Sequence, residues 1–382
     1  MRRRAWALRR ADRVATIVLC AALAGCASPA KVDRSLQPPG AEDRISALPV
    51  RLDERKIDVG GMFPSSDVAE RKSFITALEG ARRTGDAAAA ADAGALFAAF
   101  NISSTPDDFA RRLVDGFMLV EMRGDEGTSS LEGLLTGYAT PVVAARVRRD
   151  DTFRFPLIGD IRKSAPELLA APRREILASP KALAGAIAWV DDPATWALVE
   201  TNGTARLVIE GADGRAREKL ISRAATNGRP WTGLGRALAA RGLLEPEGFT
   251  LADVLRVSRE NPAAAEEAAM DNERLVYFGE VAEGNFPPAL GIRGARLMGG
   301  YSCAADQSVY PPGSVLVIVR KRADAKPDEP AEARLAFVMD AGGAIKGPGR
   351  IDIYLGQGTE SLVRAGALRE NVAVYRLVSR TR

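Results

Sequence analysis

Four short runs rich in β-branched and aromatic residues follow one another between residues 314 and 378 of this 382-residue chain. Gly, Pro and charged residues separate them, as expected of strands joined by turns. Several short strands close together favour a small barrel, because a closed sheet leaves no unpaired edge. We therefore expect a mainly β protein with helices (α+β). The runs are SVLVIVR (314–320), ARLAFVMD (333–340), RIDIYLG (350–356) and VAVYRLV (372–378).

Two of these runs carry an aspartate. Asp340 closes the second run, just before Gly342 and Gly343. Asp352 shares one face of the third run with Tyr354, because strand side chains alternate. We expect both acids at one rim of the barrel. Enzymes that cleave glycosidic bonds commonly use two carboxylates. Aspartates near strand ends, however, more often cap turns or face solvent. The pattern alone leaves both interpretations open.

The absence of histidine from the whole chain narrows the chemistry further. It excludes Ser-His-Asp and Cys-His enzymes and the common zinc sites, which need imidazole as base or ligand. The run GGAIKGPG lacks the GK[ST] ending of a phosphate-binding loop, and Gly356-Gln357-Gly358 has only two glycines of a dinucleotide fingerprint. We expect no metal, no cofactor and no nucleotide.

The N-terminus has the pattern of a secretion signal. Residues 2–13 carry six arginines, and the apolar run 14–25 is shorter than the ~20 residues of a membrane-spanning helix. The run ends in Leu23-Ala24-Gly25-Cys26, which resembles a bacterial lipobox. We predict a signal peptide at 1–25, lipid on Cys26 and a flexible tether at 26–60; the alternative is an ordinary cleaved signal. Ala27-Ser28 after the cysteine suggests a periplasmic protein anchored in the inner leaflet of the outer membrane.

Charge and cysteine content are interpreted without that segment. The whole chain carries +4, and residues 1–25 contribute six arginines and one aspartate, so the remainder carries −1. It has no basic stripe with interleaved aromatics, and we expect no nucleic-acid partner. Cys20 lies in the signal and Cys26 is the lipid site, which leaves only Cys303. Cys303 is interpreted as a packed residue, because a cysteine nucleophile would need a histidine.

The middle of the chain mixes periodicities. Apolar spacing predicts scaffold helices at 67–83, 86–100 and 105–120, and later helices at 235–244 and 250–261. Residues 131–147 predict a strand broken at Gly137 and Pro141. The run 198–220 predicts a set of hairpins, with Asn202-Gly203 and Asp213-Gly214 as turn dipeptides.

One longer segment resembles a known family. MDAGGAIKGPGRIDIYLGQGTESLVRAG (339–366) is similar to the C-terminal signature of the membrane-bound lytic murein transglycosylase A family, which has a three-aspartate domain. Further segments resemble that family in the expected order, so that the resemblance covers about 131–368. They are LTGYATPVVAARVRRDDTFRFPL (135–157), AWVDDPATWALVE (188–200), NGRPWTGLGRALAARG (227–242), ENPAAAEEAAMDNERLVYF (260–278) and AADQSVYPPGS (304–314).

The resemblance implies a fold that the strand pattern does not derive. It implies a double-psi β-barrel domain built from 61–141 and 280–382, with N-terminal scaffold helices. It also implies an inserted β-rich domain at 142–279, which forms the other wall of a glycan groove.

The resemblance also implies a reaction. Asp352 matches the family's single essential acid, which cleaves the β-1,4 bond between N-acetylmuramic acid and N-acetylglucosamine in peptidoglycan and leaves 1,6-anhydromuramic ends. An acid that donates a proton near neutral pH needs a raised pKa. Here Ile351, Ile353 and Tyr354, or the neighbouring carboxylate of Asp340, are the candidate causes. Asp340 either supports this chemistry or only ties down the glycine turn.

The implied substrate is the glycan strand, and the residues proposed to contact it have structural alternatives. Tyr138 stacks on a sugar or belongs to the core. Asp306 contacts the glycan or caps a turn. The glycines and the lysine bring backbone and ammonium to a sugar or form a solvated loop. The substrate-binding set is Tyr138, Asn202, Asp306, Gly342, Gly343, Lys346 and Tyr354.

Three departures from the family pattern concern the binding side. Where the family usually has a V-Q-G-S-G run, this chain has Val199-Glu200-Thr201-Asn202-Gly203. Tyr301 replaces an arginine that is usual in the family, and Ala139 replaces the second of two usual tyrosines. An alternative function is therefore a peptidoglycan-binding lipoprotein with weak or no turnover. A third is a hydrolase with the same acids. Protein partners do not follow from the sequence.

Overall fold

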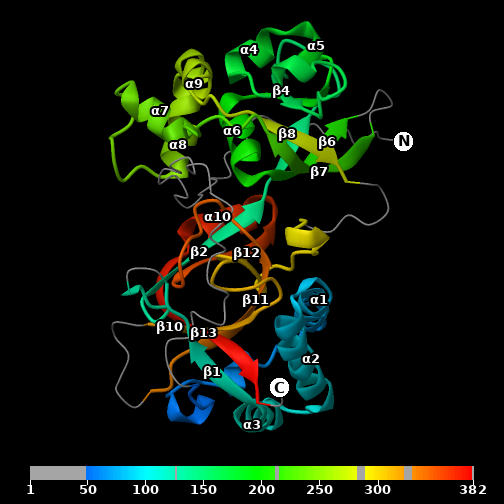
Figure 1. The fold of residues 1–382 in the computed structure, drawn as a ribbon. Helices are drawn as coiled ribbons and strands as arrows, with labels where there is room; N and C mark the ends of the chain where they lie inside the picture. Colours follow the sequence, from blue (N-terminus) through cyan, green and yellow to red (C-terminus); the bar gives the residue numbers. More distant parts are fainter. Residues whose placement is uncertain (1–48, 125–126, 211–214, 282–288, 322–328, 381–382) are drawn as a thin grey trace, which may run out of the picture.

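The computed structural model describes residues 49–124, 127–210, 215–281, 289–321 and 329–380. They form a barrel with flanking helices in the lower half of Figure 1 and a second sheet with its own helices in the upper half. The predicted signal peptide, Cys26 and most of the predicted tether lie outside the described residues. Within the described residues, no helix is both long and apolar enough to cross a membrane.

Seven strands among the described residues form the lower sheet, in the order β1-β13-β10-β11-β9-β12-β2. Pairing of β13 with β2 closes the sheet from β13 round to β2 into a barrel, with β1 outside the ring. The four runs from 314 to 378 are thus confirmed as barrel strands. The strands are β1 (Phe117–Glu121), β2 (Gly133–Thr140), β9 (Ser302–Ala304), β10 (Val315–Arg320), β11 (Ala333–Asp340), β12 (Arg350–Gln357) and β13 (Arg369–Ser379).

Alternation of side chains fills the barrel. Ile351 and Ile353 of β12 are fully buried in one apolar cluster with Val338 of β11 and Leu316 of β10. The intervening side chain of Asp352 is only partly buried. The faces predicted for the run RIDIYLG are therefore confirmed, and the acid lies on the opposite face from the barrel interior.

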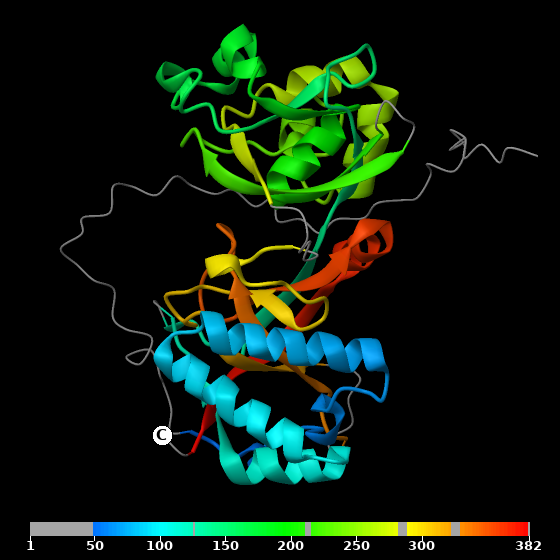
Figure 2. The ribbon, with the colours of Figure 1, turned by 90° about the vertical axis from the view of Figure 1, so that its right-hand side faces the viewer.

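Helices cover the outer face of the barrel, as Figure 2 shows in blue and cyan. Phe74, Phe100 and Phe109 join the strand residues Phe337 and Leu377 in the largest apolar cluster described. Asp67 and Thr105 accept hydrogen bonds from the first turns of the first and third helices, which fixes where those helices begin. The helices are α1 (Val68–Thr84), α2 (Ala87–Ile102) and α3 (Pro106–Gly116).

Two predictions at the edges of this unit are wrong. The helix predicted over 105–120 ends at Gly116, because Phe117–Glu121 pairs with β13 as strand β1. The tether predicted to reach residue 60 ends earlier, because Leu52 and Val59 pack into the apolar cluster and Val50 bridges to Leu119. Short 3-10 turns at Leu52–Glu54 and Gly60–Met62 shape this packed segment.

The upper sheet has the order β3-β6-β7-β8 among the described residues, with a separate β4–β5 pair. Apolar residues of the sheet and its helices, such as Leu207, Trp196 and Val254, share one buried cluster. The strands are β3 (Val142–Ala145), β4 (Phe155–Ile158), β5 (Ala186–Val190), β6 (Thr204–Glu210), β7 (Ala216–Thr226) and β8 (Val276–Glu280). The helices are α4 (Arg173–Ala178), α5 (Pro180–Leu183), α6 (Pro193–Asn202), α7 (Leu234–Ala240), α8 (Leu251–Glu260) and α9 (Pro262–Ala269), with a 3-10 turn at Pro166–Leu168.

The hairpin set predicted over 198–220 is correct only in part. β6 and β7 do form an antiparallel pair, and the Asp213-Gly214 turn between them lies outside the described residues. Leu198–Asn202, however, is the end of helix α6, and Gly203 caps it with φ 69°. A glycine adopts this left-handed conformation easily, so Asn202-Gly203 ends a helix and makes no hairpin turn.

The chain passes from barrel to upper sheet at Pro141, between β2 and β3. The two parts also meet through side chains, because Arg206 of β6 donates from Nε to Gln357 Oε1 at 3.0 Å, where helix α10 (Gly358–Ala367) begins. A 3-10 turn at Ile292–Gly294 lies between the two parts in sequence. The overall class is mixed α+β, as predicted.

Candidate active site

The two aspartates lie on either side of one short strand. Asp340 of β11 and Asp352 of β12 are both backbone partners of Ala304 in β9. Directly opposed residues share a face, and neighbouring strands lie ~4.8 Å apart, so the two Cα atoms are about 10 Å apart with only a methyl group between them. The two acids therefore lie close together, as expected, on either side of the end of β9.

Asp352 is held through one carboxylate oxygen. The Thr136 hydroxyl donates to Asp352 Oδ1 at 2.6 Å, and Arg350 Nη1 donates to the Thr136 oxygen at 2.7 Å. Burial raises the pKa of Asp352, against the lowering effects of the Thr136 hydrogen bond and the Arg350 charge. Burial is therefore the cause of the raised pKa that a proton-donating acid needs, and Asp352 can hold a proton above the usual range of a carboxylic acid.

Asp340 accepts hydrogen bonds through both of its carboxylate oxygens. Tyr138 donates from its hydroxyl to Asp340 Oδ2 at 2.7 Å, and the Ala341 N–H donates to Oδ1 at 2.9 Å. Burial raises the pKa of Asp340, while both hydrogen bonds and the charge of Arg223 lower it. The aspartate does not bond to Gly342 or Gly343 in any contact described, so its side chain is turned towards Tyr138.

Two tyrosines complete this face. The rings of Tyr138 and Tyr354 pack with centroids 5.3 Å apart, and the Tyr354 hydroxyl lies 2.9 Å from Thr140 Oγ1. Tyr354 is fully buried and Tyr138 partly so. The hydroxyl of Tyr138 therefore positions Asp340, and its ring packs on Tyr354.

Asp306 anchors the loop that follows β11. Its carboxylate accepts hydrogen bonds from the Ser308 N–H and hydroxyl at 3.0 and 2.8 Å and from the Gly347 N–H at 2.8 Å. Burial would raise the pKa of Asp306, but these hydrogen bonds outweigh it and lower the pKa. The same loop carries the exposed Lys346 and Gly343, and Gly342, whose added Cβ would lie 2.6 Å from Ile345. Asp306 thus fixes the loop rather than meeting the two acids directly.

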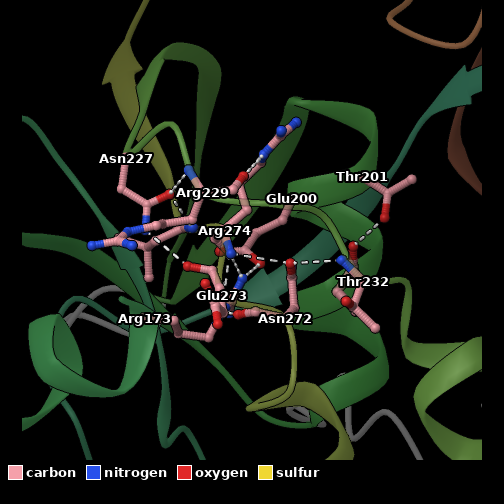
Figure 3. A network of polar contacts seen from close by, with 11 residues as sticks. Arg173, Glu200, Thr201, Asn227, Arg229, Thr232, Asn272, Glu273 and Arg274 are labelled. Carbon is pink, nitrogen blue, oxygen red and sulfur yellow. Dashed lines mark hydrogen bonds and ion pairs between the residues drawn. The ribbon is translucent and has the colours of Figure 1, made fainter. Parts of the chain in front are cut away.

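Asn202 and its neighbours come from the upper part of the molecule. The Asn202 amide donates to Leu198 O at 2.9 Å, within the last turn of α6. Glu200 faces the interior and forms a buried ion pair with Arg173 (Figure 3), so this departure from the family run does not present a charge to solvent. Arg173 also donates from Nε to Asn272 O at 2.7 Å, and its guanidinium lies 4.5 Å from the Trp196 ring centroid.

A second departure, Tyr301, lies away from the acids. Its hydroxyl donates to Glu70 of α1 at 2.8 Å, and its ring packs edge-on against Phe74. It lines a cavity of about 420 Å³ at the end of β11 opposite to Asp340, together with Arg334 and Leu335. Cys303 is fully buried and burial raises its pKa, as expected of a packed residue.

Three further residues at the site were missed by the sequence analysis. Thr136 donates a hydrogen bond to Asp352, and Arg350 donates one to Thr136. Arg223 of β7, in the upper sheet, acts electrostatically on Asp340. The alternation of side chains along a strand could have indicated Thr136 and Arg350, because Thr136 shares a face with Tyr138 and Arg350 shares a face with Asp352. No local pattern pointed to Arg223.

The fold matches solved lytic transglycosylase structures. The structure of E. coli MltA with bound chitohexaose superposes with a TM-score of 0.65 and 22% sequence identity, covering 90% of this chain and 99% of that chain. LtgG of Burkholderia pseudomallei, a lytic transglycosylase, superposes with a TM-score of 0.59 and 22% identity, covering 88% of this chain and 97% of that chain. The chain is therefore a mixed α+β protein with the MltA fold.

Sequence comparison then identifies the family. The MltA specific insert domain matches residues 134–279, and the 3D domain matches 301–378. Membrane-bound lytic murein transglycosylase A of Escherichia coli (strain K12) is 30% identical over 251 residues, which are 64% of this chain and 65% of that protein. The protein of the same name from Vibrio cholerae is 27% identical over 252 residues, with the same coverage. The chain belongs to the MltA family with a 3D domain, as the resemblance predicted, and it matches 65% of the length of these curated relatives.

Proposed function

We propose that this protein is a lytic transglycosylase that cleaves the β-1,4 bond between N-acetylmuramic acid and N-acetylglucosamine in peptidoglycan. The observation that carries the proposal is the pair of partly buried carboxylates, Asp352 and Asp340, on either side of Ala304. The named relatives are lytic murein transglycosylases, and the E. coli MltA structure contains a bound chitohexaose, which is a chain of linked sugars.

Asp352 acts first as an acid and then as a base. Its proton goes to the glycosidic oxygen as the bond from that oxygen to C1 of the muramic sugar breaks. The carboxylate then takes the proton of the C6 hydroxyl of the same sugar, while the C6 oxygen forms a bond to C1. The product is a 1,6-anhydromuramic end, no water is consumed, and Asp352 is protonated again for the next cycle.

Burial and hydrogen bonding prepare Asp352 for both steps. Burial raises its pKa, which favours the protonated acid before reaction. The Thr136 hydroxyl occupies Oδ1, which leaves Oδ2 to exchange the proton with substrate. Burial raises the pKa of Asp340, and the hydrogen bonds from Tyr138 and Ala341 oppose that rise. In its ionised form Asp340 stabilises the positive charge that develops at C1.

The wider architecture of this proposal follows the family. We propose that the closed barrel is the double-psi β-barrel domain, formed by 61–141 and 280–382, and that 142–279 is the insert that forms the other wall of the glycan groove. Asn202, Lys346, Gly342 and Gly343 border that groove in this account. Asp306 acts on it indirectly through the loop that it anchors.

We also propose that the protein works in the periplasm, tethered to the outer membrane by lipid on Cys26. The basic and apolar segment before Cys26 supports this proposal, as does the membrane-bound character in the names of the relatives. A lipid anchor places the enzyme beside the cell wall, which is its substrate.

The test is the Asp352→Asn variant, with residues 1–26 removed, on isolated murein sacculi. We expect the wild type to release soluble muropeptides and the variant to release them at least about 100-fold more slowly, since general acid and base catalysis contribute about 10²–10⁴ in rate. Both proteins should sediment with sacculi. Equal release by the variant would remove Asp352 from the mechanism, and binding without release by the wild type would leave a peptidoglycan-binding protein.

A further inference from the structure

Arg223 of β7 is an exposed cation on a rigid support. Its backbone N–H donates to Gly203 O at 2.6 Å. A Cβ on Gly203 would lie 3.4 to 3.5 Å from the Cβ, Nε and Cζ atoms of Arg223, so the arginine side chain lies against the bare backbone of that glycine. The absence of a side chain at Gly203 therefore lets the guanidinium rest along the end of α6.

The support beneath Arg223 is itself fixed. Gly203 caps α6, and Glu200 of the same helix turn is locked by its buried ion pair with Arg173, as Figure 3 shows. The register of β7 against β8 shifts between Arg223 and Ala225. Such a bulge changes the direction of a side chain, and bulges are common beside active sites.

The guanidinium of Arg223 has no hydrogen-bond or ion-pair partner among the residues that the structure describes. It does lie within electrostatic reach of Asp340, because its charge lowers the pKa of that acid. A cation near a helix C-terminus gains some energy from the helix dipole, but this contact uses none of the guanidinium donors. Helix α6 and strand β6, which flank Gly203 and so lie beside Arg223, both contact β2, the strand that carries Thr136 and Tyr138. The donors of Arg223 are therefore available on the part of the upper sheet that lies next to the barrel.

We infer that Arg223 is a subsite for a carboxylate carried on the muramic-acid arm of the glycan. An arginine guanidinium binds carboxylates through two parallel hydrogen bonds, which neutral sugar hydroxyls do not match. Muramic acid differs from N-acetylglucosamine by a lactyl group, which ends in a carboxylate when bare and carries a peptide with its own carboxylates when substituted. Arg223 thus distinguishes murein from neutral chitin-like chains. This inference rests on the proposed function.

The test measures binding in the Asp352→Asn background, where turnover does not consume the ligand. Three ligands are compared by calorimetry: glycan oligomers with peptides, the same oligomers freed of peptides by an amidase, and chitohexaose. We expect Arg223→Gln to weaken binding of a carboxylate-bearing oligomer about tenfold or more, as for loss of charge-assisted hydrogen bonds. Chitohexaose binding should change less than about twofold in the same variant.

Two control variants sharpen the result. Arg256→Gln on α8 removes the same charge from a guanidinium that is ion-paired with Glu260 and Asp253, and it should leave all three affinities unchanged. Arg223→Lys keeps the charge but not the two-pronged geometry, and it should bind carboxylate-bearing oligomers with intermediate affinity. Thermal unfolding of each variant confirms that it is folded.

The ligands also identify the carboxylate. A loss seen with the peptide-free oligomers assigns the lactyl carboxylate, and a loss confined to peptide-bearing oligomers assigns a peptide carboxylate; both support the subsite. An equal loss for chitohexaose, or no loss with any ligand, would overturn it while the proposed function stands. If the Asp352→Asn parent bound none of the three ligands, that result would instead overturn the proposed function.

Discussion

At the scale of single residues, opposing influences set the pKa of Asp352. Burial raises this pKa, and the Thr136 hydroxyl and the Arg350 charge lower it. In the proposed mechanism the acid gives up its proton in one step and recovers it in the next, so neither influence can dominate completely. Thr136 lies 216 positions away in sequence. Asp352 could be singled out from its strand pattern and the family signature, but its partner could not, because only the parallel pairing of β2 with β12 brings them together.

This balance predicts the pH dependence of a Thr136→Val variant. Loss of the hydroxyl removes a hydrogen bond that lowers the pKa of Asp352, so that pKa should rise. Because the protonated acid starts the reaction, the alkaline limb of kcat/KM should move to higher pH. Activity at the new optimum should stay within about tenfold of wild type. Thr136→Ser, which keeps the hydroxyl, should leave the profile in place; an alkaline limb at lower pH in Thr136→Val would contradict the assignment.

At the scale of elements, local patterns predicted the strands and helices whose periodicity is regular. β12 follows the alternation of RIDIYLG, and α1 begins at the Asp67 cap. The failures lie where tertiary contacts override the pattern. Phe117–Glu121 continues an apolar helical spacing yet pairs with β13. Val199–Asn202 was predicted as part of a hairpin, but it is the end of helix α6, which Asp192 caps and which begins at Pro193. The end of α6 is held by the ion pair of Arg173 with Glu200, which no local pattern shows.

That buried ion pair predicts a distinctive stability series. Glu200→Ala leaves the Arg173 guanidinium buried without its carboxylate and should cost about 3–5 kcal/mol of unfolding free energy. The double variant Arg173→Met with Glu200→Leu should be closer to wild type, because it removes both charges. Trp189, Trp196 and Trp231 all lie in the upper part of the molecule, so tryptophan fluorescence in urea reports on its unfolding. A double variant less stable than Glu200→Ala would contradict this account.

At the scale of the whole molecule, the candidate site is assembled from distant parts of the chain. β2 brings Tyr138 and Thr136, the last strands bring Asp340 and Asp352, and the upper sheet brings Arg223. The Arg206 contact with Gln357 and the Pro141 crossing join the upper sheet to the barrel. The sequence predicted the barrel strands and the family, and it predicted that Asp340 and Asp352 lie close together. The electrostatic effect of Arg223 on Asp340 depends on how the two parts pack, which strand periodicity does not predict.

The central claim is that the muramic C6 hydroxyl, and not water, attacks C1. The most direct measurement is mass spectrometry of the glycan ends released from sacculi by the wild-type protein in water enriched in oxygen-18. We predict ends lighter than a hydrolysis product by one water and without oxygen-18. Reducing ends that carry oxygen-18 would contradict the account, because they would show that water attacks C1 and that the protein is a hydrolase.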